Sequence, residues 1–323
     1  MEKIVCKRWE DFEQALAKIE SIRQAILEKN PYYSGNALFR GLGNGEWGLQ
    51  TTLERTRNLN TGKTVADLAS YYQMTFAARA SIETFTDREW PEMPDPSQFM
   101  ERLEQFRSKQ PQFFFINQVP VYRYLAYLRH HGYPSPLLDW TASPYVAAFF
   151  AFDGMAPGAE FVSVCVIVRD SSSSSSSDQS TITLLGPYVR THRRHMIQQS
   201  SYTICLLWED NFSFREHDEA LARPGALGFN GDFVRIDIPA SEQVKALKHL
   251  DSMNINPYSL FNTDDSLMRT LSRRVGLYAT PDIVQARRDS QDSAGEDAKA
   301  LNSSEPTNSD QDASSEGNLP QVG

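Results

Sequence analysis

The stretch Leu137-Leu138-Asp139-Trp140-Thr141-Ala142-Ser143-Pro144 leads directly into an apolar run that ends at Phe152. Ser143 followed by Pro144 is a strong helix start, because the serine hydroxyl can cap the first turn and proline is tolerated there. The run over 145–152 is apolar on nearly all sides, so we expect a buried helix. The segment therefore predicts a core helix with polar side chains at its start.

Strands and helices alternate irregularly around this segment. Apolar and β-branched residues predict strands over 36–41, 161–168, 201–208 and 232–238. Helical spacing predicts helices over 9–29 and 121–131. Two more are predicted, one after Ser241 with Val244, Leu247 and Leu250 inward, and one after Asp264 with Leu267, Leu271 and Val275 inward. Because the order lacks regular βαβ alternation, we predict an α+β fold with a mixed or antiparallel sheet flanked by helices.

The sequence predicts one domain over residues 1–285, with an N-terminal amphipathic helix and a mostly helical insertion over about 55–131. Ser171–Ser177 is a run of seven serines, which predicts a flexible linker or loop because it has no apolar side chain to bury. Residues 286–323 are rich in Ser, Asp, Asn, Glu and Gln, and we predict a disordered acidic tail there.

The bulk composition narrows the classes of function. The net charge of the 323-residue chain is −9, but residues 286–323 carry −5 of it, so a local basic patch elsewhere is compatible with the total. No apolar run reaches about 18 residues, and no apolar leader follows Met1. We therefore expect a cytoplasmic protein that does not enter a membrane. The three cysteines lack metal-binding spacing, so we predict no metal site.

The common nucleotide-binding and hydrolase motifs are absent from the chain. A first candidate site is Phe39-Arg40-Gly41, where an arginine ends a short strand beside a glycine. Its guanidinium can meet a ligand that approaches the backbone closely. The alternative is an arginine paired with a surface carboxylate.

A second candidate site is the start of the apolar helix, with Asp139, Trp140, Thr141 and Ser143. The free N–H groups of a helix start suit a phosphate, and Trp140 can form the wall of a pocket for a flat ring. The alternative is a capped helix with a packed indole.

A third candidate site is the basic segment Arg190-Thr191-His192-Arg193-Arg194-His195, which precedes Gln198-Gln199. Arg190, Arg193 and Arg194 form a predicted patch for phosphate or a nucleic-acid backbone. The alternative is a solvated loop. His130-His131 is interpreted as a pair at a helix end rather than as a metal site.

Taken in order, these segments resemble the FRG domain, a bacterial α/β module named for its Phe-Arg-Gly strand. The resemblance extends from about 36 to 275 and rests on Phe39-Arg40-Gly41, His131–Ala151, Arg194–Gln199 and Ile255–Phe261. Leu-Leu-Asp-Trp-Thr is its most specific part. Many members have Thr-Arg where this chain has Ser135-Pro136, so no role of that arginine is carried over.

The FRG motifs are also similar to those of ADP-ribosyltransferases. This similarity implies a split sheet of the ADP-ribosyltransferase type, with NAD as the substrate. It assigns catalytic roles to Arg40, Ser143 and Gln198. It assigns the binding of NAD to Arg40, Gly41, Trp140 and Thr141.

The same similarity exposes a chemical gap. Gln198 stands where such enzymes usually carry Glu, and a neutral amide cannot act as a general base or stabilise a ribosyl cation as a carboxylate does. Asp139 and Glu54 are the candidates to supply that carboxylate.

The resemblance implies an NAD-dependent effector of the toxin or phage-defence type that modifies nucleic acid or protein. The alternative is a non-catalytic regulatory module that binds nucleic acid or a small ligand. A protein encoded in the same operon is a further expected partner.

Overall fold

The computed structural model describes residues 2–29, 37–56, 67–91, 93–99, 101, 121–168, 180–186, 193–208, 212–222 and 232–278. The chain divides into two compact units, Met1–Leu271 and Ser272–Gly323. The described part of the second unit is the last turns of helix α12 (Asp264–Tyr278). The sheet, the cores and the pocket described below belong to the first unit.

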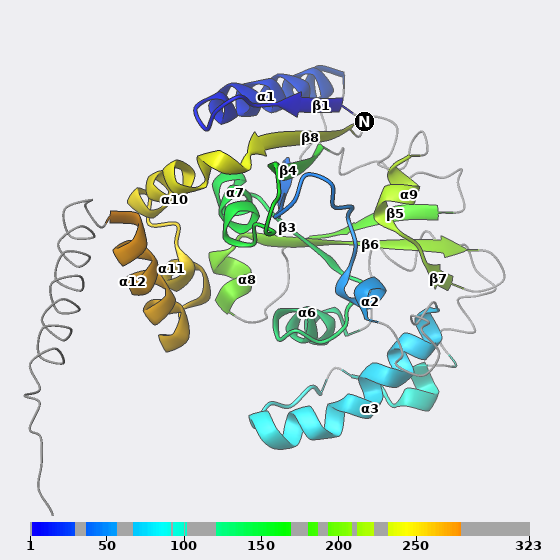
Figure 1. Cartoon of the computed structure of the whole chain (residues 1–323). Helices are drawn as coiled ribbons and strands as arrows, with labels where there is room; N and C mark the ends of the chain where they lie inside the picture. Colours follow the sequence, from blue (N-terminus) through cyan, green and yellow to red (C-terminus); the bar gives the residue numbers. More distant parts are fainter. Residues whose placement is uncertain are drawn as a thin grey trace, which may run out of the picture. The chain divides into compact units, whose positions relative to one another are not determined.

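A mixed sheet forms the centre of the first unit (Figure 1). Its strands are β1 (Glu2–Val5), β2 (Leu38–Leu42), β3 (Leu138–Thr141), β4 (Phe161–Val168), β5 (Ser180–Leu185), β6 (Ser200–Trp208), β7 (Phe212–Phe214) and β8 (Asp232–Pro239). Their spatial order is β1-β8-β4-β2-β3-β6-β5, and β7 pairs with β6. β1 runs parallel to β8 and the other pairs are antiparallel. The predicted α+β class with a mixed sheet is therefore confirmed.

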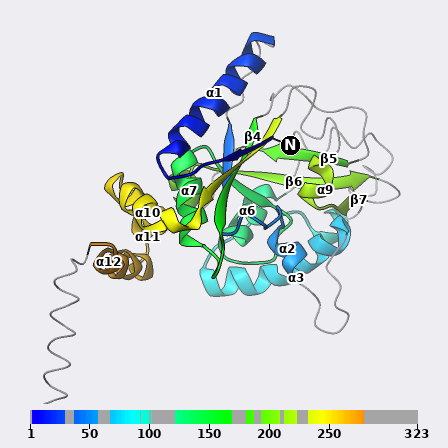
Figure 2. The same cartoon turned by 45° about the horizontal axis from the view of Figure 1, so that its top comes forward.

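Helices cover both faces of this sheet. They are α1 (Asp11–Lys29), α2 (Thr52–Arg55), α3 (Leu68–Thr86), α6 (Tyr122–His130), α7 (Pro144–Asp153), α8 (Arg193–Ile197), α9 (His217–Leu221), α10 (Gln243–Ser252) and α11 (Pro257–Phe261), with a 3-10 turn at Ala240–Glu242 and then α12. α7 packs on β2 and β4, whereas α9 lies beside β5 in both views (Figures 1 and 2). No described helix is long and apolar enough to cross a membrane.

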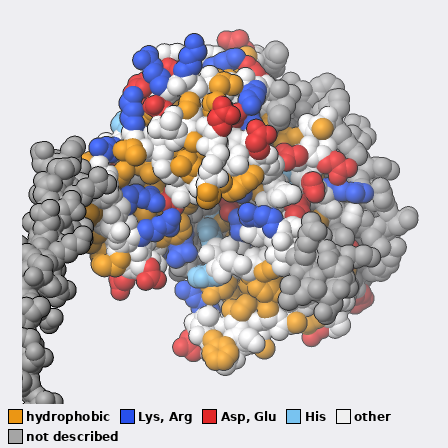
Figure 3. Space-filling model, in the orientation of Figure 1, with side chains coloured by type: hydrophobic (Ala, Val, Ile, Leu, Met, Phe, Trp, Pro, Cys, Tyr) orange, Lys and Arg blue, Asp and Glu red, His pale blue; other side chains and the backbone are white. Residues whose placement is uncertain are grey.

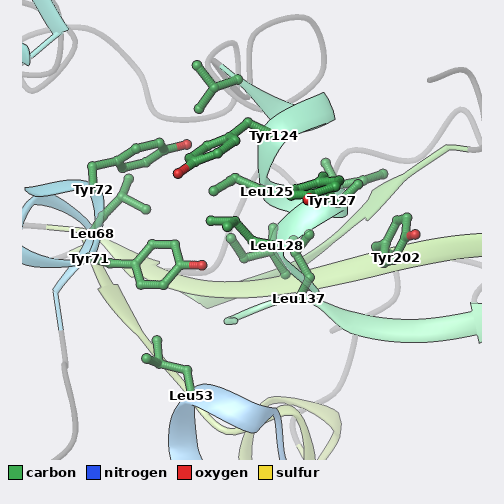
Figure 4. Packing of buried hydrophobic residues seen from close by; sticks show 14 of the residues in the cluster. Leu53, Leu68, Tyr71, Tyr72, Tyr124, Leu125, Tyr127, Leu128, Leu137 and Tyr202 are labelled. Atoms are coloured by element: carbon green, nitrogen blue, oxygen red, sulfur yellow. The ribbon is translucent and has the colours of Figure 1, made fainter. Parts of the chain in front are cut away.

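Two hydrophobic clusters among the described residues lie on opposite faces of the sheet, because alternate side chains of a strand point to opposite sides. The first core joins α3 and α6 to β6 through residues such as Tyr71, Leu128 and Tyr202, which Figure 4 shows together. The second core contains Trp140 and Cys205, beside α9.

The buried helix predicted after Ser143 is α7. The Ser143 hydroxyl accepts a hydrogen bond from the Val146 N–H (3.3 Å), and Pro144 occupies the first turn, as the sequence indicates. α7 approaches β2 so closely that a Cβ on Gly41 would lie 2.0 Å from the Ala147 carbonyl oxygen. The glycine of the Phe-Arg-Gly strand is therefore required by helix–sheet packing.

The expected inward faces of the last helices are only partly confirmed. Leu247 and Leu250 are buried as predicted, but Val244, Leu271 and Val275 are 54%, 46% and 67% exposed. On α12 the buried side chains include the polar Ser266 and Thr270, and the Thr270 hydroxyl accepts a hydrogen bond from the N–H of Tyr258 on α11 (2.8 Å). Thr263 caps this helix, one residue before the predicted position.

Several predictions lie outside the described residues. These are the seven-serine run, the tail over 286–323, Arg190, and residues 57–66 and 102–120 of the helical insertion. The described parts of that insertion include α3 and α6.

Candidate ligand pocket

A pocket of about 290 Å³ lies on the side of the sheet that carries the first core. Its walls come from β2, β3, β6, α6, α7, α8 and α11. Its charged or titratable lining side chains are Arg40, Arg129, Arg194, His130 and Asp139. The others are Phe39, Gly41, Trp140, Thr141, Ala147, Phe150, Gln198, Ser200 and Phe261. Figure 3 shows basic side chains and histidine gathered on this face around the position of α8. Three guanidiniums against one carboxylate favour an anionic ligand.

The pocket adjoins the point where β2 and β3 separate. The two strands share one ladder pair, Phe39 with Thr141. Beyond that pair, the Arg40 guanidinium spans the opening and donates a hydrogen bond from Nη1 to the Asp139 carbonyl oxygen (2.9 Å). The Arg40 side chain therefore provides the hydrogen bond to the Asp139 carbonyl group that main-chain pairing of β2 with β3 would otherwise provide.

Arg40 is held in a partly desolvated position. Burial lowers the pKa of its guanidinium to about 10, and the nearby positive charge of Arg129 contributes. The side chain therefore remains charged at neutral pH. Within the described part of the chain, its Nε–H is buried without a hydrogen-bond partner. A buried, charged donor at the wall of a pocket is suited to an anionic or carbonyl oxygen of a ligand.

Asp139 is the carboxylate of the pocket. Its two oxygens accept a bidentate pair of hydrogen bonds from Arg129, at 3.0 Å from Nε and 2.5 Å from Nη2. The Arg129 side chain is 12% exposed and that of Asp139 is 39% exposed. The ion pair thus anchors Arg129, while the carboxylate keeps access to the pocket.

Glu54, the other candidate carboxylate, has a structural role. It accepts a hydrogen bond from the Thr51 N–H (2.7 Å) in the capping box of α2. Burial raises the pKa of its carboxyl group. Glu54 is not among the residues that line the pocket.

α8 and α11 close another side of the pocket. The Arg194 guanidinium lies over the Phe261 ring, 5.2 Å from its centroid, and its Nη1 is 3.5 Å from the His130 carbonyl oxygen. The Gln198 side chain donates from Nε2 to the Leu260 carbonyl oxygen (3.1 Å). The side chains of Arg194 on α8 and of Gln198 just after it are therefore oriented by contacts with neighbouring elements.

One hydroxyl joins three of the walls. Thr141 Oγ1, at the end of β3, donates to the Gln198 carbonyl oxygen (2.7 Å) and accepts from the Ser143 N–H (3.0 Å). It thereby fixes the start of α7 and the end of α8 relative to the sheet. Ser143 itself caps α7 and does not line the pocket.

Trp140 contributes to the lining, but its ring is only 2% exposed and packs in the second core. Its indole N–H donates to Thr203 Oγ1 (2.8 Å). This arrangement corresponds to the packed indole that we considered as the alternative to an open ring wall.

A comparison with protein families bears on this geometry. Residues 35–159 match the family model of the FRG domain. This FRG match includes Arg40, Arg129 and Asp139, whereas Arg194 and Gln198 lie beyond it. Neither the curated proteins nor the solved structures include a match to the chain.

Most of the predicted site residues lie together. Arg40, Gly41, Trp140, Thr141 and Gln198 line one pocket although they are far apart in sequence. The roles assigned to them remain predictions.

The predicted basic patch is divided. Arg193 is exposed and Arg194 lines the pocket, while the adjacent His195 is buried. Arg190 lies outside the described residues. The role of this patch stays a prediction.

Sequence reasoning missed Arg129 and the role of His130 in the lining. Both lie at the end of α6, where their helical spacing indicates only a solvated helix terminus. The bidentate contact with Asp139 arises from packing of α6 beside β3, which no local pattern reveals.

Proposed function

We propose that the pocket binds NAD and that this FRG protein is an ADP-ribosyltransferase-like effector that modifies nucleic acid or protein. The observation that carries the proposal is that Arg40 and Gln198, at opposite ends of the motif order, line the same pocket. The surplus of guanidiniums around them suits the diphosphate of a dinucleotide.

The size of the pocket limits how NAD fits. Its volume of about 290 Å³ is at the small end of the ~300–1,000 Å³ typical of small-molecule sites. We infer that it holds the nicotinamide-ribose end with the adjoining phosphate, and that the adenosine end extends outward. In this orientation Arg40 and Arg194 contact phosphate oxygens, and the aromatic side chains of Phe150 and Phe261 lie beside the ring.

The reaction breaks the bond between the nicotinamide nitrogen and the ribose carbon. Nicotinamide leaves with the electron pair, the ribose carbon becomes cationic, and an acceptor oxygen or nitrogen bonds to it and loses a proton. Asp139 supplies the negative charge that Gln198 lacks, so it stabilises the cation. Gln198 positions a ribose hydroxyl.

Calorimetric titration with NAD tests the binding step. We expect Arg40→Ala to weaken binding by about 10-fold or more, because a charge-assisted contact is worth about 1.5–3 kcal/mol. Arg79→Ala is the matched control, since Arg79 pairs with Glu83 on α3 and does not line the pocket. Equal affinities of the two variants would contradict the proposed site.

Release of nicotinamide in the presence of RNA, DNA and protein acceptors tests the chemistry. Release that requires an acceptor supports a transferase. Binding of NAD without release for any acceptor class supports the non-catalytic ligand-binding module instead. Absence of both binding and release rejects the proposal.

A further inference from the structure

A row of hydrogen bonds leads from the pocket into the interior. Tyr202 Oη, on β6, lies 2.6 Å from His130 Nε2 and 3.2 Å from His195 Nδ1. His130 lines the pocket, whereas Tyr202 is fully buried and His195 is 1% exposed. The three side chains come from α6, β6 and α8, so the sequence does not group them.

The number of protons limits which group can donate in each of these hydrogen bonds. Tyr202 has one hydroxyl proton, so it donates to at most one of the two imidazoles, and the Ser200 side chain is a further hydrogen-bonding group at its hydroxyl. Burial raises the pKa of Tyr202, so its hydroxyl keeps that proton at neutral pH. In two of the possible arrangements Tyr202 donates to one imidazole and accepts from the other, and these two differ by the shift of one proton along each bond.

We propose that His130, Tyr202 and His195 form a proton relay that opens into the pocket at His130. In the starting state, His130 donates from Nε2 to Tyr202, and Tyr202 donates to His195 Nδ1. A proton from a group in the pocket is taken up at His130 Nδ1. The Nε2 proton then moves to the Tyr202 oxygen, and the Tyr202 proton moves to His195, which becomes the cation.

The use of this relay rests on the proposed function. An acceptor that bonds to the ribose carbon must give up a proton, and the Gln198 amide cannot take it. His130 is an imidazole in the pocket lining and can. Because three guanidiniums also line the pocket, transfer of the charge to His195 relieves repulsion at its wall.

Among the described residues, Asp139, Arg129 and Arg194 are the charged groups that we find near the relay. Asp139 and Arg129, which pair with each other, are the charged groups that act on Tyr202. Arg194 reaches the His130 carbonyl oxygen and precedes His195 on α8. The relay therefore runs beside the charges that line the pocket.

Imidazole nitrogen spectra of the ligand-free protein test the relay directly. We expect His130 Nε2 and His195 Nδ1 to differ, with one protonated and the other not. Tyr202→Phe should remove this complementarity. Tyr122→Phe is the matched control, because Tyr122 contacts the Tyr202 ring at 5.9 Å but donates to the Gly186 carbonyl oxygen. Two protonated nitrogens in the wild type, or resonances unchanged by Tyr202→Phe, would overturn the relay.

Steady-state kinetics test its use. Tyr202→Phe should lower kcat by about 10-fold or more and leave the KM for NAD unchanged, because proton transfer and not binding is impaired. Tyr122→Phe should leave both constants unchanged. Equal losses in the two variants would show a merely structural role. If the wild type releases no nicotinamide, the proposed function fails, and the spectra still decide whether the relay exists.

Discussion

Arg40 donates a hydrogen bond from Nη1 to the main-chain oxygen of Asp139, 2.9 Å away, across the opening between β2 and β3. A strand that separates from its neighbour leaves carbonyl groups without ladder partners, and buried carbonyl groups need one. Arg40 satisfies this need from a side chain, so the sheet can open beside the pocket. The same Asp139 holds Arg129 through its carboxylate, which makes it the common anchor of two pocket arginines.

Arg40→Lys separates the effect of charge from that of shape. Lysine keeps the positive charge but loses the planar set of donors that can reach the Asp139 oxygen and a ligand together. We expect the Kd for NAD, measured by calorimetry, to rise by about 10-fold. An unchanged Kd would mean that charge alone suffices at this position.

Asp139→Asn is expected to affect turnover and binding in opposite directions. Loss of the carboxylate removes stabilisation of the ribosyl cation, so nicotinamide release should fall by at least about 100-fold. Loss of a negative charge from an anion site should leave the affinity for ADP-ribose equal or higher.

Glu54→Gln is the matched control for this substitution, because it makes the same acid-to-amide change in the capping box of α2. It should alter neither turnover nor affinity. If both variants lost turnover equally, Asp139 would have no special role.

The neighbouring arginines of α8 should differ. Arg194 lines the pocket and lies over Phe261, whereas Arg193 is exposed and does not line it. We expect Arg194→Ala to weaken NAD binding by about 10-fold and Arg193→Ala to leave it unchanged in the same titration. The reverse order would contradict the assigned pocket wall.

Gly41→Ala tests the close approach of α7 to β2. The added Cβ would lie 2.0 Å from the Ala147 oxygen and 2.6 Å from the Ala151 nitrogen, and both are backbone atoms. We expect a loss of about 3 kcal/mol or more in the free energy of unfolding, measured by chemical denaturation. Gly276→Ala, on α12, meets nothing within 4 Å and should not destabilise the protein. Equal effects would show that helix–sheet contact does not require glycine.

His217 should make the free energy of unfolding depend on pH. The Thr203 hydroxyl accepts a hydrogen bond from the Trp140 indole and shares another with His217 Nε2 (2.9 Å), and the buried His217 Nδ1 has no partner among the described residues. Burial, aided by the charge of Arg40, lowers the pKa of His217 from 6.5 to about 3.

Between pH 6.5 and 3 the unfolded chain therefore binds a proton that the folded chain does not. Stability should fall as the pH is lowered through this window, by up to about 1.4 kcal/mol per pH unit, with no further loss from His217 below it. His217→Gln should reduce that slope in denaturation curves recorded across the window. An unchanged slope would assign the acid sensitivity to other groups.

The elements that could be predicted are those with a strong local pattern. The apolar run after Ser143 forms α7, and the β-branched run at Phe161–Val168 forms β4. β1 was missed because it is a four-residue strand with alternating partial exposure, and its partner β8 lies far away in the sequence.

The pocket was only partly accessible from sequence. The order of the motifs and their resemblance to known families selected Arg40 and Gln198, and both residues line one pocket. Arg129 was missed because its role depends on the packing of α6 beside β3. The ring of Trp140 was harder to place, because which side of a strand faces which core is settled by tertiary packing rather than by the residue type.

The lining residues run from Phe39 near the start of the chain to Phe261 in α11. A nascent chain that has not yet emerged as far as α11, or a proteolytic fragment that ends before it, lacks part of the wall. A chain that is still being synthesised therefore has no complete pocket until Phe261 has left the ribosome.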